Sequence, residues 1–182
     1  GYKILMSKEA YQVLTEKFAE SEELKFKSID YLDQNLQKIL GAEVRMPLMD
    51  SFFKENSCPV ENETRWLIDF NKESFNGKAK LEAKIDDFEY RLVPFVFQDD
   101  LKDLTMETDS FPVQYSNENI GFVSAVYYSP KLSKQFGYAY INKEYAYTNV
   151  DAFEVEVNSM AHKITTENSP LLITESSNVT VI

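Results

Sequence analysis

The side chains of this sequence that could act as nucleophile, base or metal ligand are few and scattered. Cys58 and His162 are the single cysteine and the single histidine of the 182 residues. One cysteine and one histidine make poor material for a zinc site, which needs three or four such ligands. Cys58 lacks the basic or glycine-rich surroundings that activate a thiol, and His162 has no partner evident in the sequence. No Ser-His-Asp arrangement and no glycine-rich phosphate loop can be recognised.

One short connection between two strand-like runs has a specific sequence that an ordinary hairpin turn does not require. The segment SPKLSK, residues 129–134, joins two runs that alternate like half-buried strands. Pro130 presets the backbone for a turn, and the residues beside it hold the register of the hairpin. The turn is therefore interpreted mainly as scaffold, with direct contact to a ligand as the alternative.

Composition and charge exclude several classes of partner. The formal net charge is −11, and this acidic excess works against binding a phosphate backbone, so we expect no nucleic acid partner. A small anion stays possible, because a local pocket need not share the sign of the whole molecule. No run of about 18 apolar residues indicates a membrane span, and the first residues lack the zones of a secretory signal. These features favour a cytoplasmic protein, with an organelle lumen as the alternative.

The first 85 residues carry helical patterns with one strand-like run. Ser7 is a plausible N-cap for a helix over 7–21, and a second helix is predicted over 28–41, with Gly41 at its C-terminal stop. A long connection follows. The run TRWLIDF, 64–70, predicts a strand, and FNGKAKLEAKI, 75–85, predicts a short helix entered through Asn76 and Gly77.

From about residue 86 the pattern changes to short alternating or apolar runs separated by turn residues. This spacing favours a small antiparallel barrel or sandwich. The acidic run 98–110 between the first two strands is expected to be a surface loop. The sequence thus predicts an α+β chain with two domains, 1–85 and 86–182. The expected strands are 88–97, 111–116, 120–129, 136–142 and 152–158, with 160–166 and 170–174 as further candidates.

The paired runs around the SPKLSK turn carry a family resemblance. IGFVSAVYYSPKLSKQFGYAYINKEYA, 120–146, resembles the signature hairpin of the C-terminal barrel of the glycine cleavage system T protein family. These are tetrahydrofolate-dependent aminomethyltransferases, and their relatives include dimethylglycine and sarcosine oxidising enzymes. The segments 46–72, 74–81 and 90–97 are similar to further stretches of the family in the same order.

The resemblance implies a fold and a partner. Residues 1–85 would form the second half of a folate-binding α/β domain, and residues 86–182 would form the C-terminal barrel. In the family, most of the folate pocket and the aspartate that assists one-carbon transfer lie in the first half of the protein. The chain therefore resembles a C-terminal portion or a separately encoded partner, and we expect a missing N-terminal half or a partner subunit as its companion.

The resemblance also marks positions for tetrahydrofolate. Three of them differ from the family, because Lys3 stands in place of a glutamate, Gly41 in place of an arginine and Met49 in place of a tyrosine. Glu43 is kept. Lys3, Glu43 and Met49 are the predicted cofactor-binding positions, although a carboxylate at a helix end, such as Glu43, also commonly pairs with a nearby cation. Trp66, which precedes a strand in the family, is expected in the core, with a stacking surface as the alternative.

Two hypotheses follow for function. In the first, the chain belongs to a protein that transfers a one-carbon unit from an amine to tetrahydrofolate, with a degenerate folate site in this portion. In the second, it is a non-catalytic structural module, or a subunit of an amine-oxidising complex, that no longer binds folate. Both predict an exposed apolar patch where the missing portion docks.

Overall fold

A computed structural model of the chain describes residues 5–20, 34–46, 53–54, 57–101, 104 and 111–173. The chain divides into two compact units, Gly1–Asp33 and Gln34–Ile182. Within the described residues, no helix has both the length and the apolar character needed to cross a membrane.

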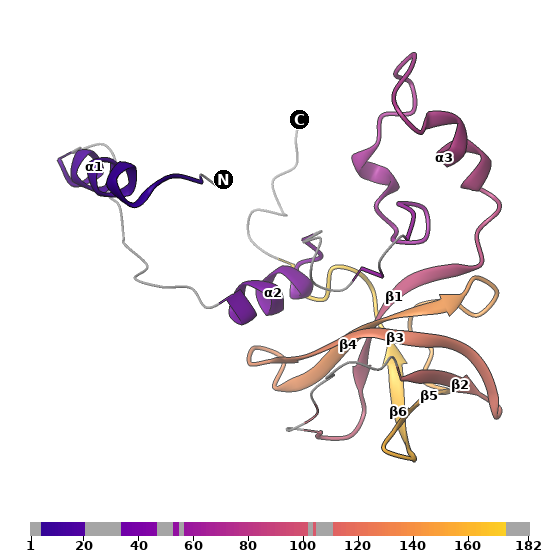
Figure 1. The fold of residues 1–182 in the computed structure, drawn as a ribbon. Helices are drawn as coiled ribbons and strands as arrows, with labels where there is room; N and C mark the ends of the chain where they lie inside the picture. The colour runs from indigo at the N-terminus through magenta and orange to yellow at the C-terminus, as the bar shows by residue number, and fades with distance from the viewer. Residues whose placement is uncertain are drawn as a thin grey trace. The chain divides into compact units, whose positions relative to one another are not determined.

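The first unit contains α1, Lys8–Ala19 (Figure 1). Ser7 caps it as predicted, because its Oγ accepts a hydrogen bond from the backbone N–H of Ala10 at 3.3 Å. This bond satisfies one of the N–H groups that a helix leaves unpaired at its start. Glu9 in the first turn and Lys17 in the last turn complement the helix dipole.

The second unit begins with α2, Gln34–Glu43. The prediction that this helix stops at Gly41 is wrong, since two more residues continue it and Gly41 is buried within it. The residue that turns left-handed is Arg45, with φ of 55°. The N–H of Met46 bonds the carbonyl of Gly41 at 2.7 Å and the N–H of Arg45 bonds that of Ala42 at 3.2 Å, which closes the last turn. Ser28, the predicted cap, lies outside the described residues.

The described residues between α2 and the barrel form turns and two short helices. The predicted strand over 64–70 is wrong: Arg65–Leu67 form the 3-10 helix η1, closed by a bond from the Ile68 N–H to the Arg65 carbonyl. A strand needs a neighbour to pair its backbone groups, and none of the described strands pairs with this segment. The predicted helix after Gly77 is confirmed as α3, Lys78–Lys84, with Gly77 at φ of 90°.

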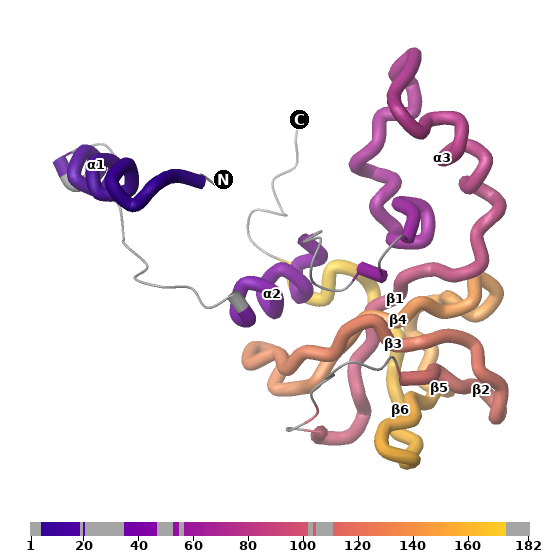
Figure 2. The backbone as a smooth tube through the Cα atoms, in the orientation of Figure 1, coloured from indigo at the N-terminus to yellow at the C-terminus, as the bar shows by residue number. Residues whose placement is uncertain are grey.

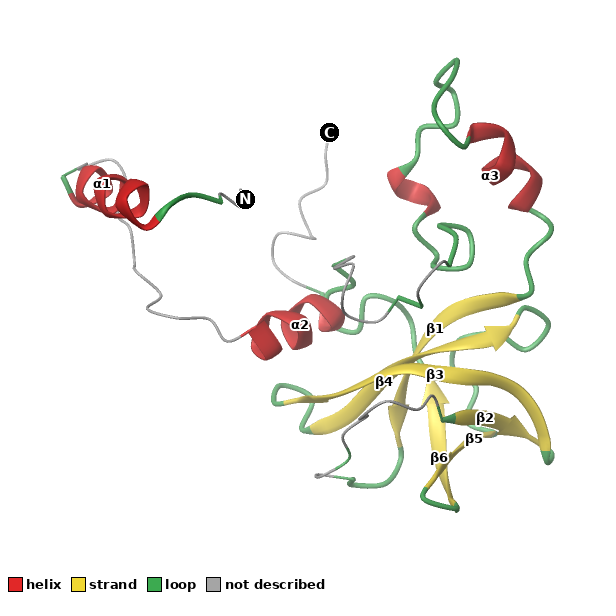
Figure 3. Cartoon of the chain, viewed as in Figure 1, coloured by secondary structure: helices red, strands yellow, loops and turns green. Residues whose placement is uncertain are grey.

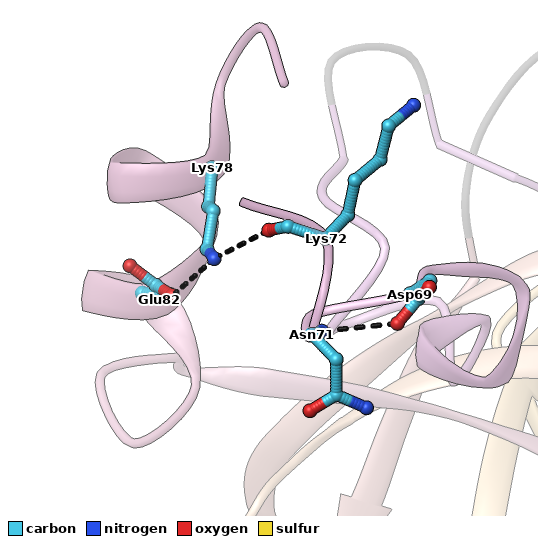
Figure 4. A network of polar contacts seen from close by, with 5 residues as sticks. All are labelled: Asp69, Asn71, Lys72, Lys78 and Glu82. Atoms are coloured by element: carbon cyan, nitrogen blue, oxygen red, sulfur yellow. Dashed lines mark hydrogen bonds and ion pairs between the residues drawn. The ribbon is translucent and has the colours of Figure 1, made fainter. Parts of the chain in front are cut away.

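A small polar network holds the start of α3 to the loop before it (Figure 4). The Lys78 Nζ donates to the backbone carbonyl of Lys72 at 2.7 Å and lies 3.7 Å from the Glu82 Oε1, one helical turn further on. In the same loop, the Asp69 Oδ1 accepts from the N–H of Asn71 at 3.0 Å. Glu82 is half exposed, so its ion pair contributes only a few tenths of a kcal/mol.

The antiparallel barrel predicted for the second half is confirmed. Its six strands close in the order β1-β4-β3-β2-β5-β6, with every pair antiparallel. Figures 1 and 3 show the strands curling into one barrel, and the tube in Figure 2 follows the same path from β1 to β6. The candidate strand 170–174 is wrong over its described part, 170–173, which has bends. The strands are β1 Tyr90–Phe97, β2 Pro112–Tyr115, β3 Glu118–Ser129, β4 Lys134–Asn142, β5 Phe153–Val157 and β6 Met160–Thr166.

The barrel has a packed interior and one covered outer face. Alternating strand residues fill the interior, among them Val93, Phe95, Val123, Ile141 and Ile164. A second cluster lies on the outside, where Ala42 of α2 packs with Leu92, Ala125, Phe136, Tyr138 and Tyr140. Strand β4 is therefore buried on both faces. Ala139 and Ile141 belong to the interior cluster, whereas its aromatic residues belong to the outer cluster with Ala42.

Candidate functional site

Glu43, a predicted cofactor-binding residue, is bonded to the SPKLSK turn. Its side chain is only 3% exposed, and its Oε1 accepts a hydrogen bond from the Ser129 Oγ at 2.5 Å. The same Oγ accepts from the N–H of Leu132 at 3.0 Å, which closes the turn. The N–H of Leu172 donates to the Glu43 carbonyl at 3.0 Å. The turn is thus held to the end of α2 through a buried serine.

Replacing Ser129 with alanine is expected to lower the free energy of unfolding by about 2 kcal/mol, because a buried carboxyl group and a turn N–H both lose their partner. Urea unfolding followed by circular dichroism measures the change. Ser133→Ala in the same turn is the matched control, since the Ser133 Oγ reaches only the Pro130 carbonyl at 3.4 Å on the surface. Equal effects of the two substitutions would contradict a specific bond to Glu43.

Two buried tyrosines of β4 fix the segments outside the barrel. The hydroxyl of Tyr138 donates to the carbonyl of Ala42 in α2 at 2.7 Å. The hydroxyl of Tyr140 donates to the Asn62 Oδ1 at 2.6 Å and accepts from the N–H of Lys54 at 2.9 Å. Burial raises the pKa of Tyr138 to about 12 and raises the pKa of Tyr140 as well. Both hydroxyls therefore stay protonated donors at neutral pH.

A cavity of about 280 Å³ lies between the end of α2, the turn at 60–67 and the start of β1. We call it the arginine cavity, because Arg45, Arg65 and Arg91 line it together with Glu63, Trp66 and Phe88. The Arg91 Nε lies 2.7 Å from the Glu63 Oε1, and the Arg45 guanidinium donates to the backbone carbonyl of Glu63. Three positive side chains and one negative side chain leave this hollow with a local charge of +2 on an acidic protein.

The structure describes one of the three predicted cofactor-binding residues. Glu43 is buried at the foot of the barrel turn, whereas Lys3 and Met49 lie outside the described residues. Their assignment to folate stays a prediction. Gly41 is buried and offers no side chain to a ligand. The sequence did not single out Arg45 or Arg65 as site residues. Arg45 is a positive charge shortly after the predicted helix end, and Arg65 is a positive charge next to Trp66.

Three further expectations concern single residues. The expected core position of Trp66 is wrong, because its side chain is 65% exposed at the mouth of the arginine cavity. Cys58 is a free, half-buried thiol. His162 on β6 does have a partner that the sequence did not indicate, since its Nδ1 lies 3.3 Å from the Asp99 Oδ2.

The fold defines the class of this protein first: a closed six-stranded antiparallel barrel with a helix packed on its outer face. Residues 91–172 match the family model described as the glycine cleavage T-protein C-terminal barrel domain. The barrel of this chain is therefore a member of that domain family, as the sequence resemblance indicated.

Full-length relatives support the same assignment over part of their length. The chain is 29% identical over 147 residues to the aminomethyltransferase of Caldanaerobacter subterraneus subsp. tengcongensis, covering 80% of this chain and 38% of that protein. It is 31% identical over 108 residues to the aminomethyltransferase of Thermoanaerobacter pseudethanolicus, covering 59% of this chain and 28% of that protein. The chain therefore spans well under half the length of these curated relatives.

A solved structure shows the same fold. The crystal structure of glycine cleavage system aminomethyltransferase T from Bartonella henselae superposes with a TM-score of 0.71 and 12% sequence identity. The superposition covers 90% of this chain and 44% of that chain. The likeness extends beyond the barrel strands and so includes part of the helical region.

Proposed function

We propose that this chain is the C-terminal portion of an aminomethyltransferase-like protein that transfers a one-carbon unit from an amine to tetrahydrofolate. The observation that carries the proposal is the buried bond between Glu43 and Ser129. It joins the residue that the family resemblance assigns to folate with the turn that carries the family signature. Residues 91–172 match the family barrel on either side of that turn.

In this proposal the chain positions one wall of the folate site and leaves the chemistry to an aspartate-bearing portion. The Tyr138 hydroxyl holds the last turn of α2 on the barrel, and Ser129 holds the Glu43 carboxyl. A rigid support of this kind matters in group transfer, because small misplacements of a bound reactant slow the reaction strongly. The companion would be the missing N-terminal half or a partner subunit that carries the aspartate.

Two observations favour a second candidate, a structural module that no longer binds folate. Gly41 is buried at the position where the family has an arginine, and one oxygen of Glu43 is already bonded inside the protein. Losing a charged hydrogen-bond partner typically costs a ligand about 1.5–3 kcal/mol. Such a module would keep the barrel for packing against a partner, such as the body of an amine-oxidising complex.

Calorimetric titration with tetrahydrofolate under anaerobic conditions separates the two candidates. We expect micromolar binding to the gene product that contains the aspartate-bearing portion. Binding by the 182-residue chain alone would place the whole ligand site here, and binding by only the longer protein would make the site shared. A blank for both proteins would remove the folate function and leave the structural module.

A variant of Glu43 refines this titration. Glu43→Gln keeps an oxygen that accepts from the Ser129 hydroxyl, so its stability should change little. If Glu43 contacts folate, the variant binds tetrahydrofolate about tenfold or more weakly, because the charged acceptor is lost. Glu73→Gln, at an exposed position in the loop before α3, makes the same change of net charge and is the matched control. Unchanged affinity of Glu43→Gln would limit Glu43 to a structural role.

A further inference from the structure

The arginine cavity has an electrostatic character that runs against the rest of the protein. Arg45, Arg65 and Arg91 bring three guanidinium groups to one hollow, and Glu63 contributes the single carboxylate among the lining residues. The side chain of Arg65 makes no hydrogen bond or ion pair with any residue in the described part of the chain. A converging set of cations with spare donors attracts anions even on a protein whose net charge is −11.

Two of the three guanidinium groups, those of Arg45 and Arg91, are held in place by the fold. Arg45 donates to the backbone carbonyl of Glu63, and the Nε of Arg91 lies 2.7 Å from the Glu63 carboxylate. The guanidinium of Arg91 also lies 5.5 Å from the centre of the Phe88 ring, within range of a cation–π contact. Arg45 and Glu63 both have left-handed backbones, with φ of 55°. Such conformations are uncommon for residues with side chains, and both of these residues line the cavity.

The walls indicate which anion fits. Trp66 and Phe88 offer aromatic surface, and Val60 is a buried apolar residue of the lining. A volume of about 280 Å³ lies near the lower limit of small-molecule pockets. A single inorganic anion would leave the apolar walls unused, whereas a short carbon chain with two carboxylates would cover them and balance the charge of +2. Arginine forks also match the planar geometry of carboxylates.

We propose that the arginine cavity binds a small organic dicarboxylate. One carboxylate meets the guanidinium of Arg65, and the other meets Arg45 and Arg91 beside Glu63. The carbon chain between the two carboxylates lies along Trp66 and Phe88. This site uses none of the residues predicted to contact tetrahydrofolate, so it is independent of the proposed folate function.

Trp66 supplies a direct test, because it is the only tryptophan of the chain and it lines the cavity. Glutarate is titrated into the 182-residue chain at low ionic strength, where exposed charges are least screened, and tryptophan emission is recorded. We expect a saturable change with glutarate and none with the uncharged analogue glutaramide. No saturable change up to about 10 mM glutarate would overturn the proposal.

Two variants with opposite expected effects locate the site. Arg65→Gln should weaken glutarate binding about tenfold or more, since a charged donor is removed. It should leave the unfolding midpoint unchanged, because the side chain is exposed and has no described partner. Glu63→Gln should strengthen binding about fivefold, because it removes the negative charge that competes for Arg91. A variant that merely loosened the fold would weaken binding instead.

A control variant and a competing anion distinguish specific binding of glutarate in the cavity from general attraction of anions to positive charge. Lys80→Gln makes the same charge change as Arg65→Gln on exposed α3 and should alter the affinity less than about twofold. If Lys80→Gln weakens binding as much as Arg65→Gln, the response is general charge attraction and the proposal fails. Inorganic phosphate that binds as tightly as glutarate would likewise overturn it, because the apolar walls would then play no part.

Discussion

Gly121→Ala is expected to lower the free energy of unfolding by about 3 kcal/mol or more. A methyl group at this position would lie 2.2 Å from the carbonyl oxygen of Tyr140 and 2.9 Å from the Cα of Ile141. Both are backbone atoms of β4, the strand that pairs with β3 at this point. Because backbone atoms of a paired strand cannot rotate away as a side chain can, the two strands must separate locally.

Chemical unfolding followed by far-ultraviolet circular dichroism measures this effect, and Gly77→Ala is the matched control. Gly77 has no atom within 4 Å of the position of an added methyl group, but it has φ of 90°. Its substitution therefore carries only the strain of a left-handed backbone, about 1 kcal/mol. If Gly121→Ala costs no more than Gly77→Ala, β3 and β4 do not approach as closely at this point as the structure indicates.

Tyr138 alone is expected to lower the free energy of unfolding by about 2 kcal/mol between pH 10 and pH 12. Burial raises the pKa of this hydroxyl from 10.0 to about 12 in the folded protein. Below pH 10 the phenol is protonated in both states, so the stabilisation is fully present. As the pH rises toward 12, the unfolded chain releases its proton first, and the folded state loses this advantage. The raised pKa of Tyr140 acts in the same direction.

Tyr138→Phe isolates this contribution from the other groups that titrate at high pH. The variant loses the bond to the Ala42 carbonyl and so costs about 1 kcal/mol at pH 7. Its unfolding free energy should then decline less steeply than that of the unchanged chain. The two curves should cross at about pH 11, where the loss through Tyr138 equals the cost of the substitution. Parallel curves from pH 9 to about pH 12 would mean that the hydroxyl of Tyr138 titrates alike in the folded and unfolded states.

The same two tyrosines hold the helical region on the barrel. Tyr138 anchors α2 and Tyr140 anchors the segment that contains Asn62. Both tyrosines belong to the outward face of β4. Ionisation of either would remove a donor between the barrel and the residues that line the proposed sites. Loss of dicarboxylate binding at high pH should therefore precede loss of barrel circular dichroism.

The sequence by itself determined the local elements of this protein. Alternating or apolar runs predicted five of the six strands and made the sixth, 160–166, a candidate. Side chains of a strand point to opposite faces, and the barrel buries the inward face. Ser7 and Gly77 marked helix starts through their own backbone and side-chain chemistry. The motifs around Ser129 and Pro130 indicated the family, and the match over residues 91–172 confirms it.

Only the tertiary structure decided which of these residues meet. Glu43 and Ser129 are 86 residues apart in the sequence, and no local sequence pattern predicts the hydrogen bond between them. Tryptophan is a large apolar residue of the kind expected in a core, yet Trp66 is exposed. Its segment forms a 3-10 helix beside the arginine cavity and does not pair as a strand. The arginine cavity likewise combines the end of α2, η1 and the start of β1. The spacing of apolar residues along one segment indicates which of its faces is buried. Contacts between distant segments depend instead on how the closed barrel and its covering helix place those segments.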